Sequence, residues 1–159
     1  MHPLQNKTST PHWLAVCFPQ LTQDLLSRGQ SSTDARPAAW RAPANDEDAE
    51  RHALQRLAAW CYQYSDQVCI PGDRSGLFLE AGASERLFGP ASELGERLTR
   101  ELGQLGYHAV TGSASTPEAA WLAAGESLHL PAAGDIRRQL GSLSLDRLYL
   151  ERSQRLALE

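Results

Sequence analysis

The chain has 159 residues, of which 42% are hydrophobic and 21% are charged, and its formal net charge is −4. These values are typical of one globular domain that is large enough to bury a core. Acidic and basic residues are mixed along the chain, which argues against a protein that holds DNA mainly through clustered basic side chains. No apolar run reaches the ~18 residues of a membrane-spanning helix.

The cysteines Cys17, Cys61 and Cys69 are odd in number and form no C-x-x-C pair. They therefore predict reduced thiols rather than a disulfide framework or a zinc site. The apolar run at 13–18 is too short for a signal peptide, and no basic segment precedes it. These features together predict a cytoplasmic protein with no membrane partner.

The first 45 residues alternate between ordered and polar segments. Residues 1–12 are polar and predict a disordered tail. Residues 13–18 are typical of a buried strand, and residues 20–27 of a short helix with leucines on one side. The segment 28–45 is rich in Ser, Ala and Pro, which predicts a linker with Trp40 as its only large apolar side chain.

A long helix and a hairpin are predicted next. Apolar residues recur at helical spacing between Asn45, a candidate N-cap, and Tyr64. Residues 68–70 and 76–82 are typical of short strands. The turn-forming residues 71–74 lie between these two strands, so the pair predicts a β-hairpin.

The remaining core elements are a helix, a strand and another helix. The helix starts near Pro90 and ends before Gly106, a residue typical of a helix C-terminus. Its apolar stripe consists of four leucines, Leu94, Leu98, Leu102 and Leu105. A strand is predicted over 107–112 and a capped helix over 117–125. Two further short helices are predicted over 133–141 and 151–158.

This order of elements predicts an α+β fold. Strand, helix, strand, strand, helix, strand is the split βαβ order of a ferredoxin-like βαββαβ sheet, with its two helices on one face. Short C-terminal helices follow that unit.

Five segments of the chain carry a resemblance to a known family. They are WLAVCFPQL, LQRLAAWCYQYSDQV, GLFLEAGASERLFG, LGYHAVTGSASTPEAAWLAA and LGSLSLDRLYLERSQRLAL. In this order they resemble ImuB-type proteins, the catalytically degenerate branch of the Y-family DNA polymerases. The resemblance implies a palm-like domain over 13–130, with the linker at 28–45 in place of the fingers. It also implies that 131–159 starts a thumb-like helical segment and that the chain is truncated to the palm region.

The same resemblance locates the positions of the polymerase metal ligands. Active Y-family members hold two metal ions with one Asp on the first palm strand and an Asp-Glu pair at the start of the central strand. Here the first position falls on Val16 or Cys17, and the pair falls on Ser75 and Gly76. None of these side chains is a carboxylate ligand for Mg²⁺. The resemblance therefore implies a protein that is not an enzyme and needs no cofactor.

Two alternatives stay open at this point. One is a residual metal-dependent nucleotidyl-transfer enzyme on the same palm fold, with Asp73, Glu80 and Glu85 as ligands. Glu80 corresponds to an acid that is not a metal ligand in active members. The other alternative is an inactive truncated remnant.

Other catalytic patterns are absent from the sequence. GDRSG and GSAS lack the G-x-x-x-x-G-K-[ST] phosphate loop, and both are predicted to be turns. No G-x-S-x-G serine elbow occurs. The five histidines are scattered, and no two lie four residues apart, so they predict no metal site.

The resemblance implies an adaptor in DNA-damage-induced mutagenesis, that is, in SOS-type translesion synthesis. The implied partners are a RecA-like protein, a second replicative-type polymerase and the sliding clamp, with weak or no autonomous DNA binding. Trp40 and Trp60 are the candidate anchors for a protein partner. Arg137 and Arg138 are the candidate contacts to a nucleic-acid backbone. An exposed sheet edge offers a further docking route by strand addition.

Overall fold

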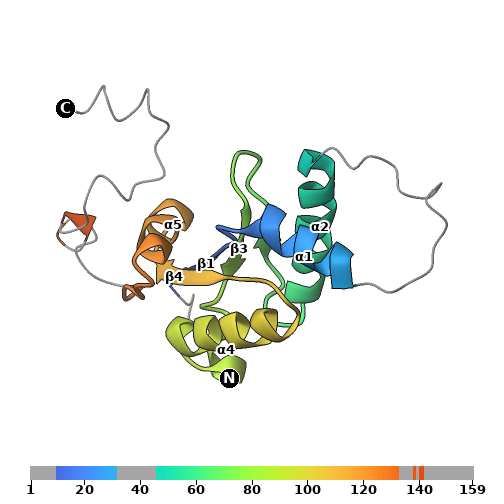
Figure 1. The fold of residues 1–159 in the computed structure, drawn as a ribbon. Coiled ribbons are helices and arrows are strands. Elements are labelled where there is room, and N and C mark those ends of the chain that lie inside the picture. The colour runs from blue at the N-terminus through green and yellow to red at the C-terminus, as the bar shows by residue number, and fades with distance from the viewer. Residues whose placement is uncertain (1–9, 32–45, 133–137, 139, 142–159) are drawn as a thin grey trace, which may run out of the picture.

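The computed structural model describes residues 10–31, 46–132, 138, 140 and 141. Within these residues, helices and strands follow one another along the chain (Figure 1). They are β1 (Trp13–Cys17), α1 (Leu21–Ser31), α2 (Asp46–Cys61), β2 (Val68–Cys69), β3 (Gly76–Glu80), α3 (Glu85–Phe88), α4 (Ala91–Gln104), β4 (Val110–Ala114) and α5 (Pro117–Gly125). No helix in this part of the chain is both long and apolar enough to cross a membrane.

The strands form one antiparallel sheet in the order β2-β3-β1-β4. In the centre, β1 pairs with both β3 and β4, with Trp13 opposite Glu80 on one side and opposite Ala114 on the other. The predicted hairpin is present, because Val68 of β2 pairs with Leu79 of β3. This is the strand order of a ferredoxin-like sheet, so the predicted α+β fold is confirmed.

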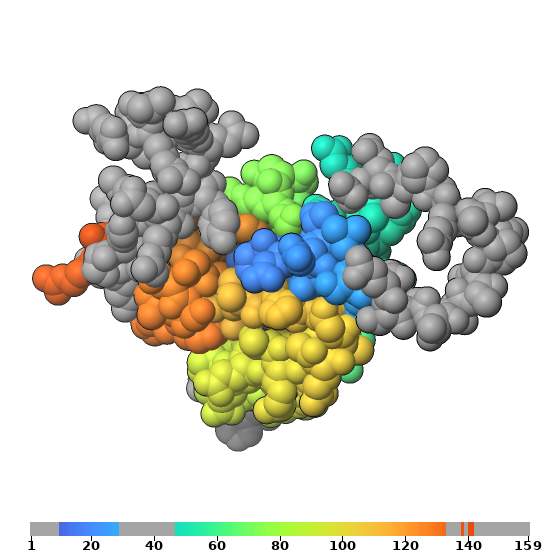
Figure 2. Space-filling view, in the orientation of Figure 1, coloured from blue at the N-terminus to red at the C-terminus, as the bar shows by residue number. Residues whose placement is uncertain are grey.

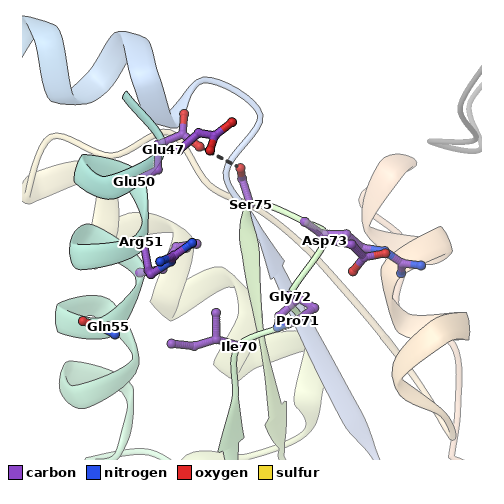
Figure 3. Close-up of a pocket in the computed structure, with 11 residues that line it drawn as sticks. Glu47, Glu50, Arg51, Gln55, Ile70, Pro71, Gly72, Asp73 and Ser75 are labelled. Atoms are coloured by element: carbon purple, nitrogen blue, oxygen red, sulfur yellow. Dashed lines mark hydrogen bonds and ion pairs between the residues drawn. The ribbon is translucent and has the colours of Figure 1, made fainter. Parts of the chain in front are cut away.

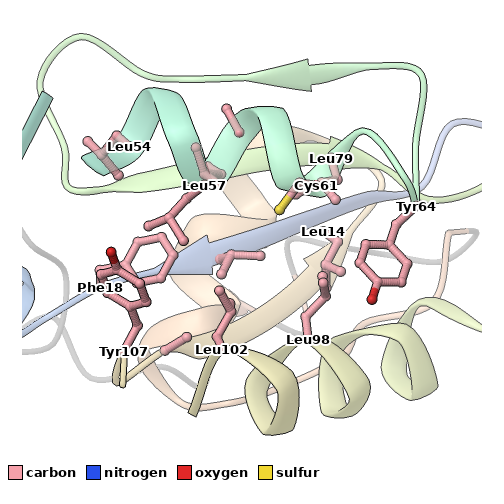
Figure 4. Packing of buried hydrophobic residues seen from close by; sticks show 14 of the residues in the cluster. Leu14, Phe18, Leu54, Leu57, Cys61, Tyr64, Leu79, Leu98, Leu102 and Tyr107 are labelled. Carbon is pink, nitrogen blue, oxygen red and sulfur yellow. The ribbon is translucent and has the colours of Figure 1, made fainter. Parts of the chain in front are cut away.

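One face of the sheet packs against α2 and α4 (Figure 4). Leu14, Val16 and Phe18 point to this face because alternate residues of a strand lie on the same side. The stripe of α4 covers them with three buried leucines, whereas the fourth, Leu105, is exposed. The layer between the sheet and the helices α2 and α4 is the larger of the two core layers. The helical periodicity of the sequence predicted it.

The second face of the sheet is covered by α5, on the side away from α2 (Figure 1). Ala15 and Cys17 of β1 point to this face and pack with Trp121 of α5. The helix lies very close to β4, because a Cβ atom on Gly112 would come within 2.1 Å of the Ala124 nitrogen. The sequence predicted the two helices of the first face, and α5 adds a second layer that it did not assign to a face.

The predicted position of the last strand was wrong by about three residues. The strand was expected over 107–112, but β4 runs from Val110 to Ala114. Three residues of the predicted GSAS turn, 112–114, are therefore strand. The reason is tertiary, because β4 must extend to Ala114 to pair with Trp13 at the start of β1.

The linker predicted from residue 28 also starts later, because α1 continues to Ser31. Arg28 holds this last turn in place: its guanidinium lies 4.5 Å from the centre of the Tyr107 ring and donates a hydrogen bond to the Leu105 carbonyl. In the space-filling view α1 adjoins the end of α4 (Figure 2). The predicted tail up to residue 9, the rest of the linker and most of the thumb-like segment lie outside the described residues.

Asp24 on α1 provides a second link to the same connection. Its side chain is only 4% exposed, and its Oδ2 atom accepts a hydrogen bond of 2.7 Å from the backbone N–H of His108. Its Oδ1 atom lies 2.7 Å from Nδ1 of the same histidine. One carboxylate thus joins two segments that are 84 residues apart in the sequence.

We expect Asp24→Ala to lower the free energy of unfolding by about 2–3 kcal/mol, because hydrogen bonds to a charged group contribute about 1.5–3 kcal/mol. Urea unfolding monitored by circular dichroism would measure the change. Asp66→Ala, at an exposed position, is the control and should leave the midpoint nearly unchanged. Equal stability of the two variants would show that the Asp24 link contributes nothing.

Candidate functional site

The four positions that the resemblance equates with metal ligands lie together at one end of the β1–β3 pair. Cys17 is directly opposite Gly76, and Val16 is opposite Leu77. The carbonyl oxygen of Ser75 accepts a hydrogen bond of 2.9 Å from the N–H of Phe18, which extends the pairing by one step. The two strands therefore bring together positions about 60 residues apart, as the prediction requires.

Only one of the two candidate positions on β1 faces the same side as Gly76. Val16 points into the core between the sheet and the helices α2 and α4. Cys17 points to the opposite face, toward α5. Cys17 and Gly76 are therefore the pair whose side-chain positions share the α5 face.

The indole of Trp121 fills the space above this pair. A Cβ atom on Gly76 would lie 2.4 Å from Cζ3 of Trp121 and 2.7 Å from the carbonyl oxygen of Val16. The ring is only 7% exposed and packs edge-to-face with Phe78, with 5.8 Å between the ring centroids. No side chain can be added at Gly76 unless the indole moves.

Two further groups determine the electrostatics of this site. The Arg74 guanidinium lies 5.3 Å from the centre of the Trp121 ring, in a cation–π arrangement. Burial raises the pKa of the Cys17 thiol to about 12, and the nearby Arg74 charge opposes this rise only in part. The site thus contains a neutral thiol and a cation in place of a set of carboxylates, and a neutral thiol is a poor metal ligand.

Glu80 lies at the other end of β3 and has a structural role. Its Oε1 atom accepts hydrogen bonds from the N–H groups of His12 (3.0 Å) and Gly82 (2.9 Å). Its Oε2 atom accepts one from the N–H of Ala83 (3.0 Å). The buried carboxylate therefore holds the turn into α3 and fastens the segment before β1 to that turn.

The structure does not bring together Asp73, Glu80 and Glu85, the alternative metal ligands. Asp73 lies before β3 and Glu80 ends it, and the strand itself spans about 13 Å at ~3.3 Å per residue. Glu85 is exposed on α3. Across residues 10–31 and 46–132, no group of three or more His, Cys, Asp or Glu side chains is placed to hold a metal ion.

A pocket of about 570 Å³ lies beside Ser75, between α2 and the β2–β3 turn (Figure 3). Glu50 forms part of its wall and accepts hydrogen bonds from Thr22 and, at 3.4 Å, from the Ser75 hydroxyl. The wall carries both signs of charge, in Glu47, Glu50, Arg51, Asp73 and Arg74. For this pocket the sequence predicted only the start of the helix near Asn45. It did not predict the pocket itself, because the contact between α2 and Ser75 joins residues that are far apart in the sequence.

Of the predicted partner anchors, Trp60 is partly buried rather than free on the surface. It packs against the main core and contacts Tyr64, with 5.3 Å between the ring centroids. Trp40 and Arg137 lie outside the described residues, and Arg138 is exposed. The structure therefore supports at most a partial surface role for Trp60.

Sequence comparison identifies similar proteins in one bacterium. Protein ImuB from two strains of Caulobacter vibrioides is 32% identical to this chain over 129 residues in each case. The matched region covers 79% of this chain but only 28% of each relative. The chain is thus ImuB-like over most of its own length, in agreement with the resemblance of the five segments. No protein-family model matches the chain, and no solved structure gives a significant match.

We expect Gly76→Ala to destabilise the fold by about 2–3 kcal/mol, because the methyl group would collide with the Trp121 ring and the Val16 carbonyl. Gly103→Ala is a matched control: nothing lies within 4 Å of its added Cβ, and alanine in a helix should stabilise by about 0.5–1 kcal/mol. Urea unfolding of both variants measures the difference.

The double variant Gly76→Ala/Trp121→Leu tests whether the indole is the cause. The smaller leucine side chain leaves room for the methyl group, so the two changes should cost less together than the sum of their separate effects. Purely additive effects would show that the clash lies with the Val16 carbonyl alone.

Proposed function

We propose that this chain is a non-catalytic, ImuB-type palm that acts as a protein–protein adaptor in DNA-damage-induced translesion synthesis. One observation carries the proposal. The Trp121 indole occupies the space above Gly76, at the position where the resemblance places a metal-binding carboxylate.

Two-metal phosphoryl transfer requires carboxylates that hold both ions close to the reacting oxygens. Here a carboxylate side chain at Gly76 would have to displace a buried ring. The charged group that lies over that ring is the Arg74 guanidinium, which pairs with Asp73 at 3.4 Å and supplies no metal ligand. Restoring the ligands would therefore require concerted changes at Cys17, Gly76 and Trp121, which favours a role without catalysis.

The edges of the sheet offer a docking route for a partner. The outer edge of β4 carries backbone hydrogen bonds to Leu128 and Leu130. The strand β2 at the other edge is only two residues long and is followed by Ile70 and Pro71, with Cys69 and Ile70 exposed. We assign strand addition by a partner to this β2 edge, where the N–H and C=O groups of Val68 face away from β3 and those of Cys69 face toward it.

Several surface arginines form ion pairs, and these pairs argue against strong DNA binding by the chain alone. Arg97 lies 2.8 Å from Glu101, Arg74 lies 3.4 Å from Asp73, and Arg51 pairs at 3.9 Å with a neighbouring acid. A phosphate would have to compete with these carboxylates for each guanidinium. Association with proteins therefore agrees better with this surface than association with a phosphate backbone.

The adaptor role is tested by titrating the purified chain with a RecA-like protein, a replicative-type polymerase and a sliding clamp from the same organism. We expect at least one of them to bind, with Kd on the order of micromolar. Cys69→Lys should weaken that binding at least tenfold, because a lysine blocks strand pairing at an edge. Gln63→Lys, also exposed, is the control. Failure of all three proteins to bind would overturn the proposal.

The alternative of residual metal-dependent nucleotidyl transfer has less support, because Asp73, Glu80 and Glu85 lie apart and the described residues hold no group of three or more acidic, His or Cys side chains placed for a metal ion. Calorimetric titration with Mg²⁺ and Mn²⁺ separates the two functions. We expect no uptake at millimolar concentration, and no primer extension. Uptake that disappears in Asp73→Asn would instead support the enzyme. A folded chain that binds neither metal nor partner would indicate an inactive remnant.

A further inference from the structure

The outer edge of β4 is covered by the three residues Leu128–Leu130, which we call the strap. The N–H of Ser113 donates a hydrogen bond of 3.1 Å to the Leu128 carbonyl, and the N–H of Leu130 donates one of 2.8 Å to the Ser113 carbonyl. Ser113 and His129 thereby form a parallel β-bridge. The strap thus occupies the edge groups that another strand would use.

The side chain of His129 fastens the strap to the body of the domain. Its Nδ1 atom lies 3.1 Å from Oγ of Ser113, a residue that is fully buried. Its ring fills a notch over α4, because a Cβ atom on Gly95 would lie 2.7 Å from Cε1. His12 adds a contact from the other side, with Nε2 2.9 Å from the Leu130 carbonyl.

The strap leaves α5 through a strained residue. Ser127 has a φ of 53°, in the left-handed region that costs a non-glycine residue about 1 kcal/mol. The N–H of Ser127 still donates to the Ala124 carbonyl, so the helix end holds this conformation. The closed strap is therefore maintained by the contacts of His129 and His12 and by its two backbone hydrogen bonds to Ser113. A 2.8 Å hydrogen bond from the Leu128 N–H to the Ala123 carbonyl and the packing of Leu130 against the α5 layer add to these contacts.

We propose that the strap is a pH-sensitive cover on the edge of β4. Neutral His129 holds the strap closed, and protonation of its imidazole releases the strap. Release would expose the N–H and C=O groups of Ser113 to pairing with an extended segment of another chain. This device is independent of the adaptor role and of the β2 edge assigned above.

The groups around His129 set the sign of the effect. Burial lowers the pKa of His129, and the nearby His12 lowers it further, whereas Glu96 on α4 raises it. From β4 the ring is faced by Thr111 and Ser113, which carry no charge. The released imidazole binds a proton more readily than the closed one. The closed state is therefore fully favoured above the ordinary histidine pKa of about 6.5 and is weakened as the pH falls below it.

Amide hydrogen exchange, followed by NMR between pH 8 and pH 5, tests the proposal. After correction for intrinsic exchange rates, protection of the Ser113 and Leu130 amides should fall below pH 6.5, by up to about tenfold per pH unit for one proton. The amide of Leu79 is the control: it lies in β3, between β1 and β2, and its protection should stay constant. Strap amides with a pH-independent protection would overturn the proposal.

Two variants identify the responsible group. His129→Gln keeps a polar side chain near Ser113 but cannot be protonated, so it should abolish the pH dependence, whereas His12→Gln should retain it. In the unmodified chain, the Cε1 proton shift of His129 should titrate below the ordinary histidine pKa, at the acid end of the pH range over which protection falls. A His129 titration at or above the ordinary pKa, or a dependence that persists in His129→Gln, would assign the transition to another group and refute the role of His129.

Discussion

The pairing of β1 with two neighbours is the constraint on which the rest of the structure depends. Because β1 lies in the centre of the sheet, its alternate side chains must supply apolar surface to both faces. Leucine, valine and phenylalanine meet two long helices on one face. Alanine and cysteine meet α5 on the other, where small residues let the helix approach closely. The same register places Cys17 against Gly76, so the position of the candidate site is a consequence of the packing.

The second face of the sheet is packed as a dry, apolar layer. A cluster of acidic side chains on a sheet face must stay hydrated or hold cations, because buried unpaired charges are costly. With a thiol at position 17 and a glycine at position 76, the same face can be dry, and Trp121 contributes a large apolar surface to it. The same indole leaves no room for a side chain at Gly76, so the packing of this face and the residue type at position 76 are coupled.

Sequence patterns predicted the helices whose positions are determined by residues close to one another in the sequence. The helical spacing of leucines placed α4, and Thr116 with Pro117 placed the start of α5, because caps and stripes act within a few residues. The end of β4 was misplaced because its register depends on Trp13, about a hundred residues earlier. The last turn of α1 was missed because Arg28 is held by groups near residue 105. Long-range contacts of this kind leave no period in a sequence.

The candidate site shows the same division between local and long-range causes. Aligned motifs were sufficient to single out positions 16, 17, 75 and 76, but not to decide between Val16 and Cys17, because the face of a strand residue follows from its partners. Glu80 stayed open as an alternative ligand because one carboxylate in a strand can bind either a metal or backbone N–H groups. Its three N–H donors come from both sides of the sequence, and only the folded chain brings them to one carboxylate. A motif can therefore single out a set of positions, whereas the packing around them determines what chemistry they can support.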